Sequence, residues 1–188
     1  MGQDRLPPLP PEQWTDAQRQ HAEAIIRGPR GALLAPFVPM LRSPELMGHA
    51  QRMGEYLRYR SAISPRLSEL AILVIARQWS QQVEWAIHAP IAMHEGVSPQ
   101  TVHAIAEGRR PPSMTQDEAL VHDFCMELHR NREISDVIWT GAVQRLGEQG
   151  VVDLIGLNGY YTFLSMLMNA ARTPAPSSAH EPLQHLPL

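Results

Sequence analysis

The sequence predicts an all-α protein, a bundle of about eight helices. Apolar residues recur at helical spacing through the middle of the chain, whereas no stretch alternates with strand period over a useful length. Three Ser-Pro pairs, at 43–44, 64–65 and 98–99, each place a capping residue before a proline at the first helical position. With 188 residues, 44% of them hydrophobic, the chain can bury one core without disulfides or metal.

The start and stop signals place the helices in order. The expected helices cover residues of about 15–27, 43–60, 65–79, 82–95, 98 onward, 115–130, 135 onward and 150–171. Thr115 and Glu118 have the spacing of a capping box. The segment 70–76 is apolar on nearly all sides, so we expect the helix over 65–79 to lie at the centre of the bundle.

The two ends of the chain differ from the middle. Residues 1–11 are rich in proline, and the segment after Arg172 reads Thr-Pro-Ala-Pro-Ser-Ser. Such composition is typical of extended or disordered segments. We therefore expect an extended arm over 1–11, a single helical domain over 12–172 and a flexible tail over 173–188.

The basic residues exclude several kinds of chemistry. All 16 of them are arginine, so Schiff-base chemistry, pyridoxal phosphate attachment and a Gly-Lys-Ser/Thr phosphate loop are ruled out for want of a lysine amine. The arginines are scattered and the net charge is only −3, which argues against a nucleic-acid partner.

The single cysteine and the apolar segments indicate a cytoplasmic protein. Cys125 has no partner for an internal disulfide, which fits a reducing compartment, and the first residues lack the apolar core of a signal peptide. The stretch 151–170 is long enough to cross a membrane, but it contains Asp153 and Asn158. A buried helix is the favoured interpretation, and we expect no membrane partner.

Three polar residues stand out against apolar surroundings: Glu69, Glu84 and His88. Burying such groups unpaired is costly, so they should be partnered or functional. Glu84 and His88 are four residues apart and share one helix face, beside Trp85. A carboxylate bonded to an imidazole fixes its tautomer and raises its basicity, which suits a general acid/base pair near neutral pH.

A wider register supports this pair. Glu69, Gln81, Glu84 and His88 fall at spacings that resemble the alkylhydroperoxidase D-like superfamily. In its peroxidase branch the positions of Gln81 and Glu84 are the two cysteines of the redox motif, which this chain lacks. The segments 66–73, 83–88, 95–98 and 156–161 resemble the carboxymuconolactone decarboxylase family in particular.

The resemblance covers about residues 40–172 and implies a helical bundle that assembles as a homotrimer or homohexamer. It also implies a decarboxylase in aromatic compound catabolism, or a related proton-transfer enzyme, that acts without a cofactor on a small carboxylated lactone or similar carbonyl compound. Glu84 and His88 would then be the catalytic base and acid, with Glu69 orienting His88. We expect Arg77 to bind a substrate carboxylate, and Trp85 and Tyr160 to line the substrate site.

Other interpretations stay open from the sequence alone. Glu69, Glu84 and His88 also form a ligand set for zinc, manganese or iron, in a metal-dependent lyase or hydrolase. A non-catalytic oligomeric binding protein of the same fold is a further alternative. A dithiol peroxidase is excluded because Cys125 is the only thiol. Cys125 with His129 is a weaker candidate pair, since a lone cysteine among apolar residues usually only packs.

Overall fold

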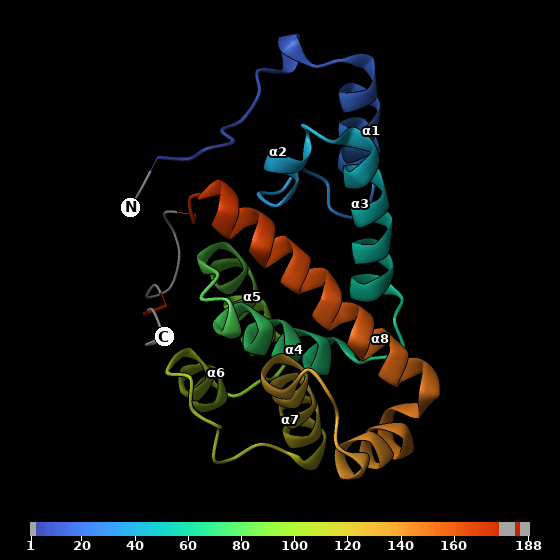
Figure 1. Cartoon of the computed structure of the whole chain (residues 1–188), viewed down its shortest axis with the longest axis vertical. Coiled ribbons are helices and arrows are strands. Elements are labelled where there is room, and N and C mark those ends of the chain that lie inside the picture. The colour runs from blue at the N-terminus through green and yellow to red at the C-terminus, as the bar shows by residue number, and fades with distance from the viewer. Residues whose placement is uncertain (1–2, 177–182, 185–188) are drawn as a thin grey trace.

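The computed structural model describes residues 3–176 and 183–184, and these residues form eight α-helices and no strand (Figure 1). The all-α class predicted from the sequence is confirmed. In chain order the elements are the 3-10 helix η1 (Pro11–Gln13) and the α-helices α1 (Asp16–Arg27), α2 (Phe37–Met40), α3 (Pro44–Tyr59), α4 (Pro65–Gln78), α5 (Gln82–His94), α6 (Pro99–Ala106), α7 (Gln116–Asn131) and α8 (Asp136–Ala171).

Helix α4 lies at the centre of the bundle, as predicted. Every residue from Leu67 to Arg77 is buried. The helix contacts α3, α5, α6, α7 and α8, so it has neighbours on all sides. Figure 1 shows α8 running diagonally across the molecule, with α3 beside its middle and α7 near its lower part. The apolar run at 70–76 therefore fixes the position of the two polar residues at its ends, Glu69 and Arg77.

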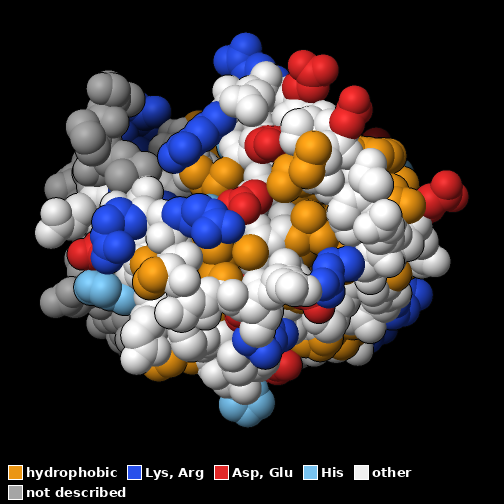
Figure 2. All heavy atoms as spheres, turned by 90° about the horizontal axis from the view of Figure 1, so that it is seen from below, with side chains coloured by type: hydrophobic (Ala, Val, Ile, Leu, Met, Phe, Trp, Pro, Cys, Tyr) orange, Lys and Arg blue, Asp and Glu red, His pale blue; other side chains and the backbone are white. Residues whose placement is uncertain are grey.

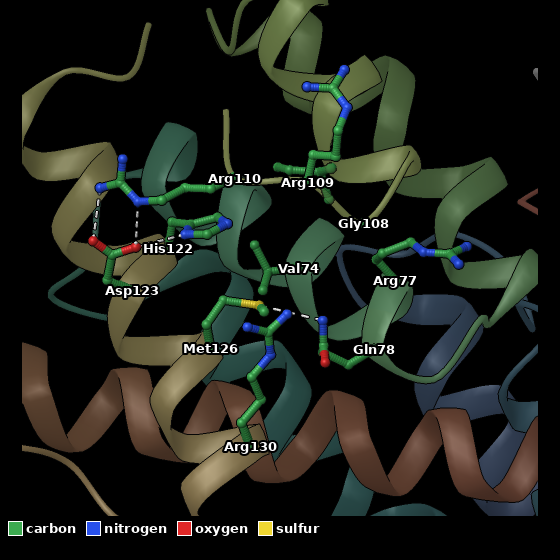
Figure 3. A pocket seen from close by; sticks show the side chains of 11 residues that line it. Val74, Arg77, Gln78, Gly108, Arg109, Arg110, His122, Asp123, Met126 and Arg130 are labelled. Carbon is green, nitrogen blue, oxygen red and sulfur yellow. Dashed lines mark hydrogen bonds and ion pairs between the residues drawn. The ribbon is translucent and has the colours of Figure 1, made fainter. Parts of the chain in front are cut away.

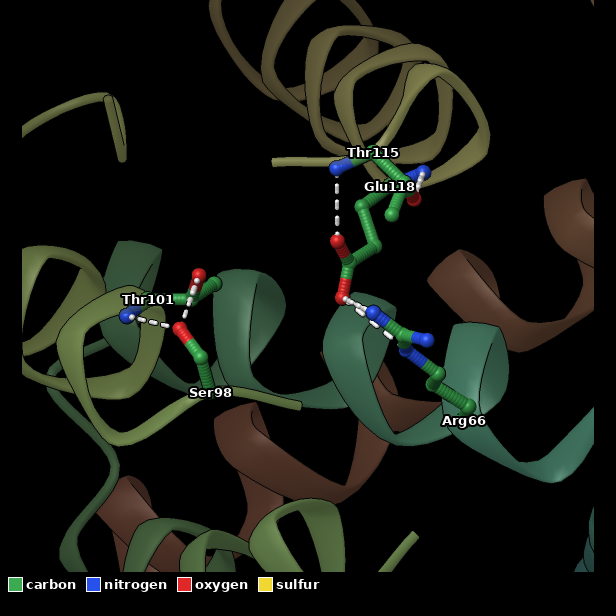
Figure 4. A network of polar contacts seen from close by, with 5 residues as sticks. All are labelled: Arg66, Ser98, Thr101, Thr115 and Glu118. Carbon is green, nitrogen blue, oxygen red and sulfur yellow. Dashed lines mark hydrogen bonds and ion pairs between the residues drawn. The ribbon is translucent and has the colours of Figure 1, made fainter. Parts of the chain in front are cut away.

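The predicted capping box at Thr115 is confirmed, and its glutamate also joins two helices (Figure 4). The carboxylate of Glu118 accepts hydrogen bonds from the Thr115 backbone N–H at 2.8 Å and from Arg66 Nε and Nη2 at 3.0 and 2.7 Å. Arg66 belongs to the first turn of α4. The start of α7 is thereby fixed to the start of α4 through one buried carboxylate.

The last two predicted helices are joined into one kinked helix. Gly147 has φ 71° and ψ 168°, outside the helical region, and the chain continues as helix on both sides of it within α8. A positive φ of this kind favours glycine. The sequence did not predict the one-turn helix α2, because Pro36 and Pro39 interrupt any helical pattern there.

Helix α8 is long and apolar enough to cross a membrane, but 56% of its most apolar window is buried inside the protein. Its buried face packs on α2, α3, α4 and α7. The two polar residues that interrupt the apolar run are also buried and bonded: Asp153 accepts from the Tyr56 hydroxyl and the Ala62 N–H, and Asn158 donates to Leu154 O. These contacts are those of a core helix.

The ends of the domain are attached to the bundle at defined points. Arg5 donates its backbone N–H to Ala171 O, at the end of α8, over 2.8 Å. Of the expected tail, residues 177–182 and 185–188 lie outside the described part. Leu183 is buried, and its backbone N–H and C=O both bond to the Gln82 side chain, at 2.9 and 2.8 Å. This part of the tail is therefore docked at the start of α5.

The surface carries charges of both signs. On the face seen in Figure 2, basic and acidic side chains are interspersed with apolar ones. Exposed ion pairs such as Arg110 with Asp123 and Arg145 with Asp117 belong to this mixed charge pattern.

Candidate active site

Glu69 and His88 meet where α4 packs on α5. Glu69 Oε2 lies 2.6 Å from His88 Nδ1, and both residues are buried, with 5% and 3% of their surface exposed. The central position of α4 turns Glu69 away from water and toward α5. A hydrogen bond between an imidazole and a carboxylate in such surroundings fixes the ring and places a proton on Nδ1.

Glu84 contacts the other nitrogen of the same ring. Its Oε2 lies 3.3 Å from His88 Nε2, one helical turn away, as the four-residue spacing predicts. Its second oxygen, Oε1, is buried without a hydrogen-bond partner among the described residues. Gln81 caps α5 by accepting from the Val83 N–H at 2.5 Å, so Glu84 sits in the first helical turn, where the helix dipole favours a negative charge.

The two carboxylates determine the protonation of His88. Burial alone lowers the pKa of a histidine, but the charges and hydrogen bonds of Glu69 and then Glu84 outweigh it and raise the pKa of His88 to about 9. The imidazole is therefore protonated at neutral pH, with one N–H toward each carboxylate. The arrangement can store a proton and deliver it at Glu84.

Glu84 and His88 face a small cavity, about 30 Å³, that also receives residues from α3, α8 and the segment before α2. Its walls are Arg30, Leu34, Pro36, Phe37, Arg58, Glu84, Ile87, His88, Tyr160, Tyr161 and Leu164. Tyr161 meets the His88 ring edge-on with centroids 5.3 Å apart, and Tyr160 meets Tyr161 in the same way. The two tyrosines thus connect the polar pair to the far wall of the cavity.

Both tyrosines remain neutral. Burial raises the pKa of Tyr160 to about 12, against an opposing effect of Arg30, and raises the pKa of Tyr161 further. Each hydroxyl is therefore a hydrogen-bond donor at physiological pH. The Tyr160 hydroxyl is buried without a hydrogen-bond partner in the described part of the chain.

The structure brings together four of the six residues singled out from the sequence: Glu69, Glu84, His88 and Tyr160. Trp85 is buried but does not line the cavity, because one residue along a helix turns its side chain by about 100° from Glu84. Arg77 lies eight residues beyond Glu69, which is about 12 Å further along α4. It donates to Gln184 O at 2.6 Å instead of facing Glu84.

Arg77 lines a different and larger cavity, about 140 Å³, between α4 and α7. Figure 3 shows the side chains of Arg77, Arg109 and Arg110 turned in different directions around it. Arg110 is bonded to both oxygens of Asp123, at 2.9 and 2.8 Å. The arginines therefore do not converge on one point. This cavity is a weaker candidate for the substrate site than the one beside Glu84.

The sequence analysis missed Arg30 and Arg58 as cavity residues. Arg58 is at the end of α3, and Arg30 lies in the turn Gly28–Gly31, in a part of the chain without helical periodicity. Proline and glycine around Arg30 are typical of a turn, and the apolar residues that follow favour packing on the rest of the protein. Neither signal points to the neighbourhood of Glu84.

The donor atoms of Glu69, Glu84 and His88 do not converge as metal ligands. The carboxylates contact opposite nitrogens of one ring, which point away from each other. In the described ranges no group of three or more His, Cys, Asp or Glu residues has an arrangement that could hold a metal ion. The geometry thus suits proton transfer along the series Glu69, His88, Glu84.

Cys125 does not join any of these groups. It is fully buried, and burial raises the pKa of its thiol to about 12. Its polar contact is the Asn158 amide, with Nδ2 3.4 Å from the sulfur. A neutral, buried thiol of this kind is not a nucleophile.

Comparison with known proteins matches one segment of the chain to a family. The model described as "Carboxymuconolactone decarboxylase family" matches residues 44–120, from the start of α3 into α7, a segment that holds Glu69, Glu84 and His88. A search of curated proteins gives no significant match. Arg30 and Tyr160 lie outside the matched segment. Residues 44–120 are therefore similar to the carboxymuconolactone decarboxylase family.

Proposed function

We propose that the protein is a cofactor-free decarboxylase, or a closely related proton-transfer enzyme, acting on a small carboxylated lactone. The observation that carries the proposal is the buried series Glu69, His88, Glu84: Glu84 lines a cavity, and its Oε1 has no hydrogen-bond partner among the described residues. The similarity of residues 44–120 to the carboxymuconolactone decarboxylase family supports a decarboxylase-like activity. The proposal assigns roles to the three residues on their geometry.

The reaction needs a proton donor beside the carbon that loses carbon dioxide. The bond between that carbon and its carboxylate breaks, carbon dioxide leaves, and the electron pair is delocalised toward the lactone carbonyl oxygen. One proton then forms the new C–H bond, so the substrate exchanges a carboxylate for a hydrogen. A preorganised site lowers the barrier by stabilising the charge that moves onto oxygen.

Glu84 is placed to deliver this proton. Glu84 lines the cavity, its Oε1 has no hydrogen-bond partner among the described residues, and its Oε2 lies 3.3 Å from Nε2 of the protonated His88 ring. The proton on His88 Nε2 passes to Glu84 and from Glu84 to carbon, which leaves the imidazole neutral until solvent returns a proton to it. Glu69 does not line the cavity and acts as a positioning residue that holds the ring through Nδ1.

The test is carbon dioxide release from γ-carboxymuconolactone by the purified protein and its variants. We expect release by the wild type, and a loss of about 10²-fold or more in Glu84→Gln and His88→Asn. His103→Gln is the matched control, because His103 also pairs with a glutamate four residues away but is exposed. It should retain wild-type activity.

Two results would overturn the proposal. Release that persists in both Glu84→Gln and His88→Asn would show that the series does not carry the reaction. No release by the folded wild type would remove this lactone as a substrate and favour the non-catalytic alternative.

We propose further that the protein forms a homotrimer or homohexamer. Helices α3 and α8 pack against each other and both expose large apolar side chains: Leu46, Met53, Tyr59, Val152, Ile155 and Met166. Exposed apolar patches of this kind often mark protein interfaces. Light scattering on the purified protein tests the proposal, and a monomer at micromolar concentration would contradict it.

A further inference from the structure

Two more polar atoms of the cavity beside Glu84 lack partners. Arg30 Nη1 and the Tyr160 hydroxyl, like Glu84 Oε1, are buried and have no hydrogen bond of normal distance and angle among the described residues, although Arg30 lies close enough to the Tyr160 hydroxyl to oppose the rise of its pKa. Leaving a buried donor unpaired costs about 1–3 kcal/mol. Two unpaired donors and one unpaired acceptor on the walls of one cavity indicate a site shaped for a polar ligand.

Arg30 is held in place without a carboxylate. Its guanidinium lies over the Phe37 ring, 5.1 Å from the centroid, and the described residues offer it no ion pair. A second arginine, Arg58, lines the same cavity and stacks on Tyr59. The wall of the cavity therefore carries two arginines without a carboxylate partner, in addition to Glu84 and the protonated His88.

We infer that Arg30 and the Tyr160 hydroxyl form a carboxylate-binding subsite that positions the substrate against Glu84. A guanidinium and a neutral hydroxyl can both donate hydrogen bonds to an anion. Arginine also matches the planar carboxylate with two parallel N–H groups. The inference rests on the proposed function for the identity of the substrate, and it makes Arg30 a specificity-determining residue.

The subsite holds a carboxylate that the reaction leaves in place. A carboxylate that departs as carbon dioxide loses its negative charge, so strong pairing with arginine would stabilise the starting state and slow the reaction. The substrate then carries a second carboxylate, and the product remains an acid. Arg30 and Tyr160 lie outside the family-matched segment, so this preference is set by other parts of the chain.

Binding requires movement of the segment that carries Arg30. The cavity of about 30 Å³ has room for about two water molecules, far less than a lactone acid. Leu34, Pro36 and Phe37 form its cover, and few backbone hydrogen bonds hold that segment: Gly31 N to Gly28 O, Phe37 N to Leu34 O and Val38 N to Ala35 O. The ligand displaces this cover as it pairs with Arg30.

Calorimetric binding of two unreactive probes tests the subsite separately from turnover. The probes are 5-oxotetrahydrofuran-2-acetate and its uncharged methyl ester. We expect the wild type to bind the acid at least about tenfold more tightly than the ester, since a charge-assisted pair is worth roughly 1.5–3 kcal/mol. Arg30→Gln should lose this preference, and Tyr160→Phe should lose part of it.

Two further variants keep the result interpretable. Arg30→Lys keeps the charge but not the paired N–H groups, so its preference should be intermediate. Arg27→Gln is the matched control, because Arg27 is three residues away, exposed and paired with Glu23. It should keep the full preference for the acid.

The outcomes separate this inference from the proposed function. His88→Asn should still prefer the acid, because it retains Arg30 and Tyr160. Acid preference that Arg30→Gln abolishes supports the subsite even if no lactone is decarboxylated. A wild type that binds the acid no better than the ester, or a preference that survives in folded Arg30→Gln, overturns it.

Discussion

Glu69 and His88, nineteen residues apart in the chain, are joined across the α4–α5 contact by a bond of 2.6 Å between Oε2 and Nδ1. Neither side chain has appreciable contact with water. A charge on the ring is therefore stabilised by Glu69 first and by Glu84 on its other side. The pair links the stability of the fold to the protonation state that the proposed reaction uses.

We predict that stability falls as the pH rises from about 6.5 to about 9. The pKa of His88 is raised from 6.5 to about 9 in the folded chain, so the folded state holds the proton more tightly than the unfolded state. The stabilisation is fully present below pH 6.5 and is lost as the pH rises through 9. At 1.36 kcal/mol per pKa unit it amounts to on the order of 3 kcal/mol.

Urea unfolding between pH 6 and 10 measures this dependence. The chain has no lysine, but eight other histidines, four tyrosines and one cysteine also belong to types that titrate in or near this range, so the contribution of His88 is measured as the difference between wild type and variant. Glu69→Gln should flatten the dependence, because the largest favourable charge on the ring is removed. Glu107→Gln, in the exposed pair with His103, should leave it unchanged. Equal slopes in wild type and Glu69→Gln would contradict the assignment.

A second prediction concerns the glycine that makes room for Tyr160. A Cβ built at Gly54 in α3 would overlap the Tyr160 hydroxyl, whereas one built at Gly159 meets nothing within 4 Å. Gly54→Ala should therefore lower the free energy of unfolding by about 1–3 kcal/mol. It should also weaken acid binding, because Tyr160 has to move.

Gly159→Ala is the control for the helix propensity of alanine. It should stabilise the protein by about 0.5–1 kcal/mol, since Gly159 lies inside α8 and is exposed. Thermal unfolding compares the two. If Gly54→Ala were as stable as Gly159→Ala, the Tyr160 hydroxyl would not occupy the space over α3.

Local signals in the sequence predicted most of the helices. They also predicted one of the two contacts in the series Glu69, His88, Glu84. The apolar run at 70–76 predicted the central helix, and Thr115 with Glu118 predicted the start of α7. The spacing of Glu84 and His88 predicted their contact, because positions four apart share a helix face. These features depend on residues close together in the chain.

The rest of the site depends on how distant segments pack. Arg30 reaches the cavity from 54 positions before Glu84, and Tyr160 from 76 positions after it, distances that no helical period encodes. The role expected for Arg77 rested on the affinity of a guanidinium for carboxylates, which says nothing of where the side chain lies in the fold. Its place about 12 Å along α4 from Glu69, beside Gln184, follows from the axial rise.

A third prediction is that Cys125 is inert in the folded protein. Burial excludes reagents and raises the pKa of its thiol to about 12, so the thiolate fraction at pH 8 falls by roughly 10³ relative to a free cysteine. Ellman's reagent should detect no thiol in the native chain and one per chain in denaturant. Rapid reaction of the native chain would show that Cys125 is accessible. Cys125 and His129 would then again be a candidate catalytic pair.

The last prediction concerns the buried carboxylate that joins α7 to α4. Glu118→Gln should destabilise the protein by about 1–3 kcal/mol, because it weakens the bonds from Arg66 and from the Thr115 N–H. Asp117→Asn is the matched control: the neighbouring Asp117 pairs with Arg145 on the surface, where an ion pair is worth about 0–1 kcal/mol.

The pH dependence of this difference identifies its cause. Burial opposes ionisation of Glu118, but Thr115 and Arg66 outweigh it and lower the pKa of its carboxyl. Its stabilising effect is therefore present above the pKa of the unfolded chain, about 4.3, and is lost as the pH falls through the lower folded value. The stability difference between wild type and Glu118→Gln should be constant from pH 5 to 8 and shrink in more acidic solution. A difference that stays the same down to pH 2 would mean that side-chain shape, and not the charge on Glu118, holds the two helices together.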